Sequence, residues 1–373
     1  MGNIISPQEN ETVVLVPPRF SVRGLTRPLE IENPMSVYFG NLFRKEVLAD
    51  LHNFSGSLAV DLLIAPETPP KVAAHVSMKG SSVTRSVEGG ELHLHLNHDF
   101  SNSLSSIGRL CVGSGSGLSG FAMISKQLEQ GRVSFTYSGD SENERKVGLR
   151  ASSDSFTIGL EVPVHDPVLS AQAWLISRVS PELYVGVSGQ PLGSPESPIL
   201  LAGSFEKRIP GTDSSYCVSS VYKMPSNELT LGFSQHLVTH RKVYNILEDK
   251  RVKFIANYVD IAVEATTHKS GFSDVSAGVS WQINKNLLVK LHASTNQGLV
   301  STLAVRNWWI PSVLTSVSAG IDRAGDPFIG GRFQLSNWLT SAEYQKGQPI
   351  STLPTTKWVV AADIDRFSNR NQL

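Results

Sequence analysis

Cysteine and charge are both scarce in this chain of 373 residues. The only two cysteines, Cys111 and Cys217, form neither a CxxC pair nor a disulfide framework, and both are expected to be small apolar fillers. Charged residues make up 18% of the sequence, against about 25% in typical soluble domains. Because 33 basic residues balance 33 acidic ones, no basic surface for nucleic acid is predicted.

Long apolar runs are missing too. No stretch of about 18 apolar residues occurs, so no transmembrane helix is predicted. The N-terminus lacks the basic segment and apolar core of a secretory signal. It reads MGNIIS instead, in which Gly2 and Ser6 fit the pattern for N-myristoylation. One acyl chain binds membranes weakly, so a modified Gly2 would assist another anchor.

Catalytic motifs are equally sparse, since GxSxG, HExxH and P-loop sequences do not occur. The stretch from Gly115 to Gly120 is a literal GxGxxG, between a strand-like run and a candidate helix, FAMISKQLEQ. Asp140 further along completes the layout of a dinucleotide-binding unit. No second βαβ unit follows, however, and a glycine-rich hairpin explains the same residues.

Histidines offer the other chemical candidate. His93 and His95 share a strand face and His98 lies close by, a spacing that could hold a metal. No Cys, Asp or Glu at a defined spacing completes a ligand set, which favours histidines that merely line a surface. We therefore expect no enzyme, no catalytic residue, no cofactor and no metal site.

One helix is predicted, over residues 34–52. Asn33 suits the N-cap and Pro34 the first helical position. An apolar stripe follows at i, i+4 spacing, with charged residues off the stripe. The stripe consists of Phe39, Phe43, Val47 and Leu51, and Arg44, Lys45 and Asp50 lie off it. Such a helix either packs on one face of a sheet or lies inside a barrel and narrows it; charged residues off the stripe favour the wet lumen.

The chain does contain many segments in which apolar and polar residues alternate, the pattern of a β-strand. In Asp274–Ile283 the side chains of Val279 and Trp281 point one way, and those of Ser280 and Gln282 point the other. The run of ten residues is long enough for a tilted strand to cross a bilayer core. Equivalent alternation recurs from about Ser57 to Ile364, with short turn signals between copies.

These repeats predict about 18–19 strands in an antiparallel meander, because the short connections leave no room for helical crossovers. Around Val259–Val263 the apolar parity changes, which indicates a bulge or a strand boundary. Tryptophans near expected strand ends would form an aromatic girdle. They are Trp308, Trp309, Trp338 and Trp358.

The two strand faces indicate a membrane barrel rather than a soluble sheet. One face is apolar and nearly free of charge, and the other is small and polar, which suits a wet lumen. Mixed charges on that polar face predict no ion preference. The candidate lumen residues are Asp61, His75, Glu91, His93, His95, Arg132, Glu161, Ser280, Gln282, Lys290, Asp322, Arg332 and Lys357.

This plan resembles the eukaryotic mitochondrial porin superfamily, which includes voltage-dependent anion channels and Tom40-type import pores. The resemblance covers most of the chain but is architectural. The family's sorting motif in the last strand is a large polar residue, any residue, Gly, two of any kind, then hydrophobic, any, hydrophobic. The sequence matches this motif at Lys357, Ala362 and Ile364 and departs from it at Val359. The resemblance implies a mitochondrial outer-membrane location; plastid outer-envelope pores are built similarly.

The sequence therefore predicts an all-β protein: a closed antiparallel membrane-spanning barrel with an N-terminal helix inside or beside it. Residues 1–54 would form the arm and helix, 55–367 the barrel and 368–373 a tail. The expected function is an organelle outer-membrane pore for ions and small metabolites. The alternatives are a component of protein translocation or assembly, and a soluble all-β binding protein. Expected partners are membrane lipid, and other outer-membrane proteins or further copies of the chain are the candidates beyond it.

Overall fold

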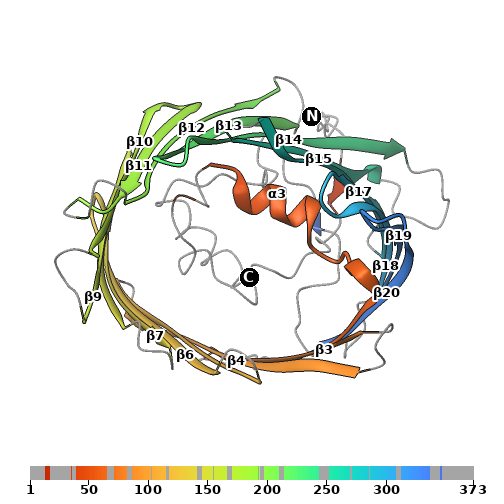
Figure 1. Ribbon diagram of the computed structural model, residues 1–373, viewed down its shortest axis with the longest axis horizontal. Coiled ribbons are helices and arrows are strands. Elements are labelled where there is room, and N and C mark those ends of the chain that lie inside the picture. Colours follow the sequence, from red (N-terminus) through yellow and green to blue (C-terminus); the bar gives the residue numbers. More distant parts are fainter. Residues whose placement is uncertain are drawn as a thin grey trace, which may run out of the picture.

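The fold is a ring of antiparallel strands that surrounds a short helix (Figure 1). The computed structural model describes residues 13–16, 35, 39–64, 71–81, 86–101, 103–114, 117–140, 145–153, 155–165, 170–191, 193, 197–209, 214–242, 252–268, 271–284, 286–307, 312–336 and 345–346. Gly2, Asn33, Pro34, Lys357 and all four girdle tryptophans lie outside these residues, as does the predicted strand over 358–364. In the described part of the chain, no helix is long and apolar enough to span a membrane.

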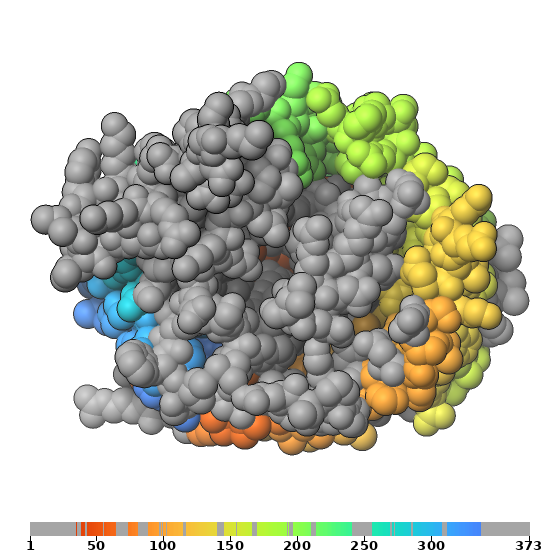
Figure 2. Space-filling view, turned by 180° about the vertical axis from the view of Figure 1, so that it is seen from behind, coloured from red at the N-terminus to blue at the C-terminus, as the bar shows by residue number. Residues whose placement is uncertain are grey.

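Nineteen strands, β2 to β20, make the ring, each of them paired with the next one in the sequence. Seen from the opposite end, they follow one another around the rim in chain order (Figure 2). The strands are β2 Ser57–Ile64, β3 Lys71–Ser81, β4 Ser86–Ser101, β5 Leu104–Gly113, β6 Gly117–Leu128, β7 Gly131–Asp140, β8 Lys146–Ser152, β9 Phe156–Pro163, β10 Gln172–Ser180, β11 Leu183–Gly189, β12 Ile199–Arg208, β13 Ser215–Met224, β14 Glu228–Lys242, β15 Val252–His268, β16 Gly271–Asn284, β17 Leu287–Ser294, β18 Gly298–Asn307, β19 Ser312–Ile321 and β20 Pro327–Ser336.

The ring closes between β2 and β20, which pair in parallel from Leu58–Gly331 to Leu63–Ser336. All other neighbouring barrel strands are antiparallel. Directions alternate along a meander, so the first and last of an odd number of strands run the same way and must pair in parallel. The predicted closed all-β barrel is confirmed, with this correction to its purely antiparallel pairing.

The outer surface of the ring is apolar. Among the side chains that the structure describes, every barrel strand except β15 carries at least one exposed large apolar residue, from Leu58 on β2 to Phe333 on β20. Inner positions hold small polar side chains instead, such as Ser125, Ser134 and Thr157. This arrangement is the reverse of a soluble sheet and fits strands that face lipid outside and water inside.

Register shows that the parity change near Val259–Val263 is neither a bulge nor a strand boundary. Strand β15 pairs with β14 without interruption from Phe254 to Thr267. The hairpin of β14 and β15 extends past the neighbouring strands. On β14 the residues after His236 no longer pair with β13, and on β15 the residues before Tyr258 do not pair with β16. On this extension β15 also pairs in parallel with β1 (Val13–Val16), which in turn pairs with β21 (Gln345–Lys346). Apolar residues at even positions of β15 instead face inward: Tyr258 pairs with Gln282 of β16, and Ala262 packs with Phe43 and Val47 of the N-terminal segment.

Helix α3 spans Asn41–Leu48, eight residues, and lies within the predicted helix over 34–52. Met35 is helical as well, while residues 34 and 36–38 lie outside the described residues. Gly40 precedes it with φ of 78°, a left-handed conformation that suits glycine and starts the helix there. Leu51 has φ of 67°, so the chain has left the helical conformation before that residue. A short 3-10 turn, Phe54–Gly56, then leads directly into β2.

Candidate functional site

The apolar side chains of the N-terminal segment pack against the inner wall. Phe39 is fully buried in a cluster with Trp174, Ile176 and Tyr184 from β10 and β11. Phe43 and Val47 pack with Ala262 of β15. Leu51 packs on a third cluster, made by Leu288, Ala304 and Leu314 of β17, β18 and β19. The segment therefore follows the wall across half of the ring, inside the barrel (Figure 1).

Glycines on three strands make room for this segment. A Cβ atom added at Gly186 would lie 2.6 Å from Cζ of Phe39, and one at Gly278 would lie 2.9 Å from Cδ2 of Leu48. A Cβ atom at Gly232 would lie 2.3 Å from Cζ of Arg44. A larger residue at any of these inward positions would therefore force the segment's side chains to shift. Inward-facing glycines within strands are the sequence signal that could have located the docking surface of this segment.

Arg44 is buried against the wall, although it was expected to face water. Its Nε lies 2.7 Å from Oε2 of Glu264 on β15, and Nη1 donates to Oγ of Ser219 on β13 at 2.7 Å. Nη1 also donates to the carbonyl oxygen of Phe39 at 3.1 Å. Arg44 therefore connects the segment to β13 and β15, and its bond to the Phe39 carbonyl oxygen also stabilises the backbone of the segment.

Lys290 of β17 holds the end of α3. Its Nζ donates to the carbonyl oxygens of Glu46 at 2.5 Å and Asp50 at 2.6 Å. The last carbonyl groups of a helix have no partners within it, and a cation near them is favourable. Lys290 is only 2% exposed, so this predicted lumen residue serves the docked segment rather than open water.

The turn after α3 is bonded to β18 and β19. Nδ1 of His52 lies 2.7 Å from Oγ1 of Thr302, and Thr302 bonds Ser318 at 2.7 Å. The backbone N–H of Asn53 donates to Oγ of Ser318 at 3.0 Å. Burial, with Lys290 and then His292 nearby, lowers the pKa of His52 from 6.5 to about 3.

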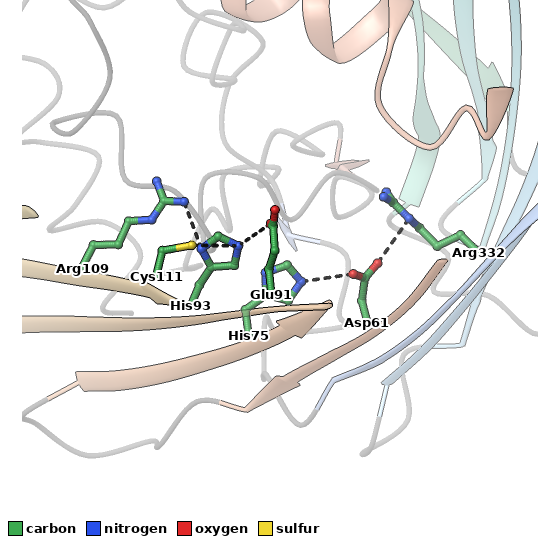
Figure 3. A network of polar contacts seen from close by, with 7 residues as sticks. All are labelled: Asp61, His75, Glu91, His93, Arg109, Cys111 and Arg332. Carbon is green, nitrogen blue, oxygen red and sulfur yellow. Dashed lines mark hydrogen bonds and ion pairs between the residues drawn. The ribbon is translucent and has the colours of Figure 1, made fainter. Parts of the chain in front are cut away.

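The wall near the seam carries a separate polar network (Figure 3). Nε of Arg332 on β20 lies 3.2 Å from Oδ2 of Asp61 on β2, and Oδ1 of Asp61 lies 3.3 Å from Nε2 of His75 on β3. The ring of His75 stacks on that of His93, with centroids 5.5 Å apart. His93 then contacts Glu91 at 3.1 Å, Arg109 at 3.1 Å and Sγ of Cys111 at 4.0 Å.

The register places most of the predicted lumen residues on the inner face. Ser280 and Gln282 are buried inside, whereas Trp281 is exposed outside. One of the predicted residues, Asp322, lies elsewhere and accepts backbone N–H groups within the β19–β20 turn. His98, the third histidine of the metal candidate, pairs with Ser106 and lies on the opposite face from His95. The inner-face group comprises Asp61, His75, Glu91, His93, His95, Arg132, Glu161, Ser280, Gln282, Lys290 and Arg332.

The glycine-rich stretch belongs to a hairpin. Strand β5 ends at Gly113 and β6 begins at Gly117, so FAMISKQLEQ is mainly strand rather than helix. Gly117 has φ of 64° and forms part of the reversal. Among the described residues, no group of three or more His, Cys, Asp or Glu is arranged to hold a metal ion.

No protein family matched this chain, and a search of curated proteins also found no match. Its architecture is consistent with a porin-type fold of the mitochondrial kind, because a closed barrel of 19 strands occurs there, whereas bacterial single-chain barrels have even strand numbers. A large closed barrel with a polar inner face fits a pore-like function.

Proposed function

We propose that this protein is a mitochondrial outer-membrane pore of the porin superfamily, through which ions and small metabolites pass. The observation that carries the proposal is the odd-numbered ring closed by a parallel seam, with an apolar outside and a polar inside. Passage is passive, since the described residues present no catalytic constellation. Gly2 would add a myristoyl anchor, and membrane lipid is the principal partner.

The sorting motif of that superfamily gives further support once the last barrel strand is known. The described ring closes at β20, and a motif in the last strand of that ring would lie there rather than over 357–364. Strand β20 supplies Gly330, Phe333 and Leu335 at the glycine and hydrophobic positions. Phe328 stands where a large polar residue is expected, so the match is incomplete.

Alkaline carbonate extraction of isolated mitochondria, followed by bilayer reconstitution of the purified chain, tests the proposal. We expect the chain to stay in the membrane pellet and to give discrete conductance steps. Release into the soluble fraction would favour a soluble binding protein. Retention without conductance steps, together with small helical membrane subunits that co-purify, would favour a translocation or assembly component.

A further inference from the structure

His52 stands at the point where the docked segment turns toward β2. Its side chain is 93% buried, as the residue is 7% exposed, and its Nδ1 is engaged with Thr302. Nε2 has no hydrogen-bond partner among the described residues. The ring of His292 on β17 lies 5.7 Å away between centroids, and that of Phe54 lies 5.6 Å away.

The surroundings suit a neutral imidazole and not a charged one. Lys290, two positions before His292 on the same strand face, brings a positive charge whose Nζ protons are directed to the carbonyl oxygens of Glu46 and Asp50. A proton on His52 would place a second buried cation beside Lys290, and a backbone hydrogen bond with Val47 is the one contact that favours the charged form. The charged and titratable groups around this site are Glu46 and Asp50 on the segment, Asp260 on β15, Asp274 on β16, Lys290 and His292 on β17, and Arg332 on β20.

We propose that His52 is a proton-operated latch, whose protonation releases the segment Phe39–Gly56 from the inner wall and widens the bore. The widening rests on the proposed pore function, but the release itself does not. His52 lies in the turn that connects α3 to the first barrel strand. In this turn Leu51, His52 and Asn53 are each hydrogen-bonded to β18 or β19. Loss of these bonds would detach the segment from the wall next to the seam.

Acid is expected to release the segment, because docking lowers the pKa of His52. A docked His52 has a pKa of about 3, and a released one would have the ordinary value of 6.5. Docking is therefore fully stable above pH 6.5, and it weakens as the pH falls, because only the released state takes up the proton. Between pH 7.5 and pH 5 the docking constant should fall about 30-fold.

The test uses the full chain in detergent and in planar bilayers at pH 7.5, 6 and 5. A nitroxide attached through Lys45→Cys, with Cys111→Ala and Cys217→Ala, reports docking, because Lys45 is exposed on α3. We expect nitroxide mobility and single-channel conductance to rise together toward pH 5. His52→Asn, whose amide can still bond Thr302 but does not titrate, should lose most of the pH response.

The control is His95→Asn, another inner-wall histidine, which should keep the pH response. An unchanged response in His52→Asn, or no change in nitroxide mobility of the parent chain between pH 7.5 and 5, would overturn the latch. If His52→Asn does not fold, His52→Gln provides the same comparison. Mobility that changes without any conductance would support the latch and contradict the pore, so the two proposals fail separately.

Discussion

The guanidinium of Arg44 on α3 and the carboxylate of Glu264 on β15 form an ion pair, with Nε and Oε2 2.7 Å apart. The side chain of Arg44 is 3% exposed and that of Glu264 is 31% exposed, so water from the lumen reaches one partner only. This contact joins the segment to the middle of the wall, and it explains why a charged residue lies on the apolar side of the helix.

Arg44→Ala should weaken docking of the segment by about 1.5–3 kcal/mol, because a charged group loses its hydrogen bonds to Glu264, Ser219 and the Phe39 carbonyl. Mobility of a nitroxide on α3 measures this directly. Lys45→Ala is the matched control, since Lys45 is exposed. Equal effects of the two changes would show that Arg44 does not hold the segment.

Gly186→Val should displace Phe39 from the wall while the barrel stays intact. The first added atom already lies 2.6 Å from Cζ of Phe39, and Val adds two more. We expect higher single-channel conductance and unchanged membrane insertion. Gly203→Ala on neighbouring β12 is the control, because a Cβ atom there makes only ordinary contacts, the nearest 3.8 Å from Oγ of Ser220. If Gly186→Val conducts like the parent chain, Phe39 does not limit the bore.

Phe135 and Thr136 are adjacent on β7 and point to opposite sides. Phe135→Arg should cost about 2–4 kcal/mol of folding stability if it lies near the bilayer midplane, whereas Thr136→Arg should cost much less. Urea unfolding in lipid vesicles measures both. Similar losses for both variants would show that β7 is buried on both faces.

Asp61→Asn should loosen the parallel seam. The carboxylate of Asp61 is buried and contacts both Arg332 across the seam and His75, so its loss should cost about 1–3 kcal/mol. Glu91→Gln should cost no more than about 1 kcal/mol, because the side chain of Glu91 is 42% exposed. Thermal unfolding in detergent compares the two, and an equal shift would show that the Asp61 pairs add nothing to the seam.

The barrel was predictable because the alternation of apolar and polar residues in a strand can be recognised within about ten residues of sequence. The alternation in Asp274–Ile283 places Trp281 outside and Ser280 inside, and the same rule applies to most of the predicted lumen residues. The parity change near Val259 misled this reasoning, because the inner face of β15 is also partly apolar where Ala262 packs with Phe43 and Val47. The predicted strand over 358–364 lies outside the described residues, and the described ring closes at β20. Closure is a property of the whole ring, so no local pattern marks it.

The contacts of the docked segment could not be predicted from spacing. The stripe at Phe39, Phe43 and Val47 identified the apolar face, and each of these residues is buried. Arg44 and Lys290 were read as lumen residues because their partners, Glu264 and the carbonyl oxygens of α3, are about 220 and 240 residues distant. These contacts appear only once the fold places α3 against β15, β16 and β17.

Single-channel conductance of the full chain, compared with that of the same chain lacking residues 1–52, tests the central claim most directly. The segment from Phe39 lies along half of the inner wall, so its removal should raise conductance while membrane insertion and strand content stay the same. Equal conductance of the two chains, both inserted and folded, would contradict the account of a pore narrowed by its own N-terminal segment.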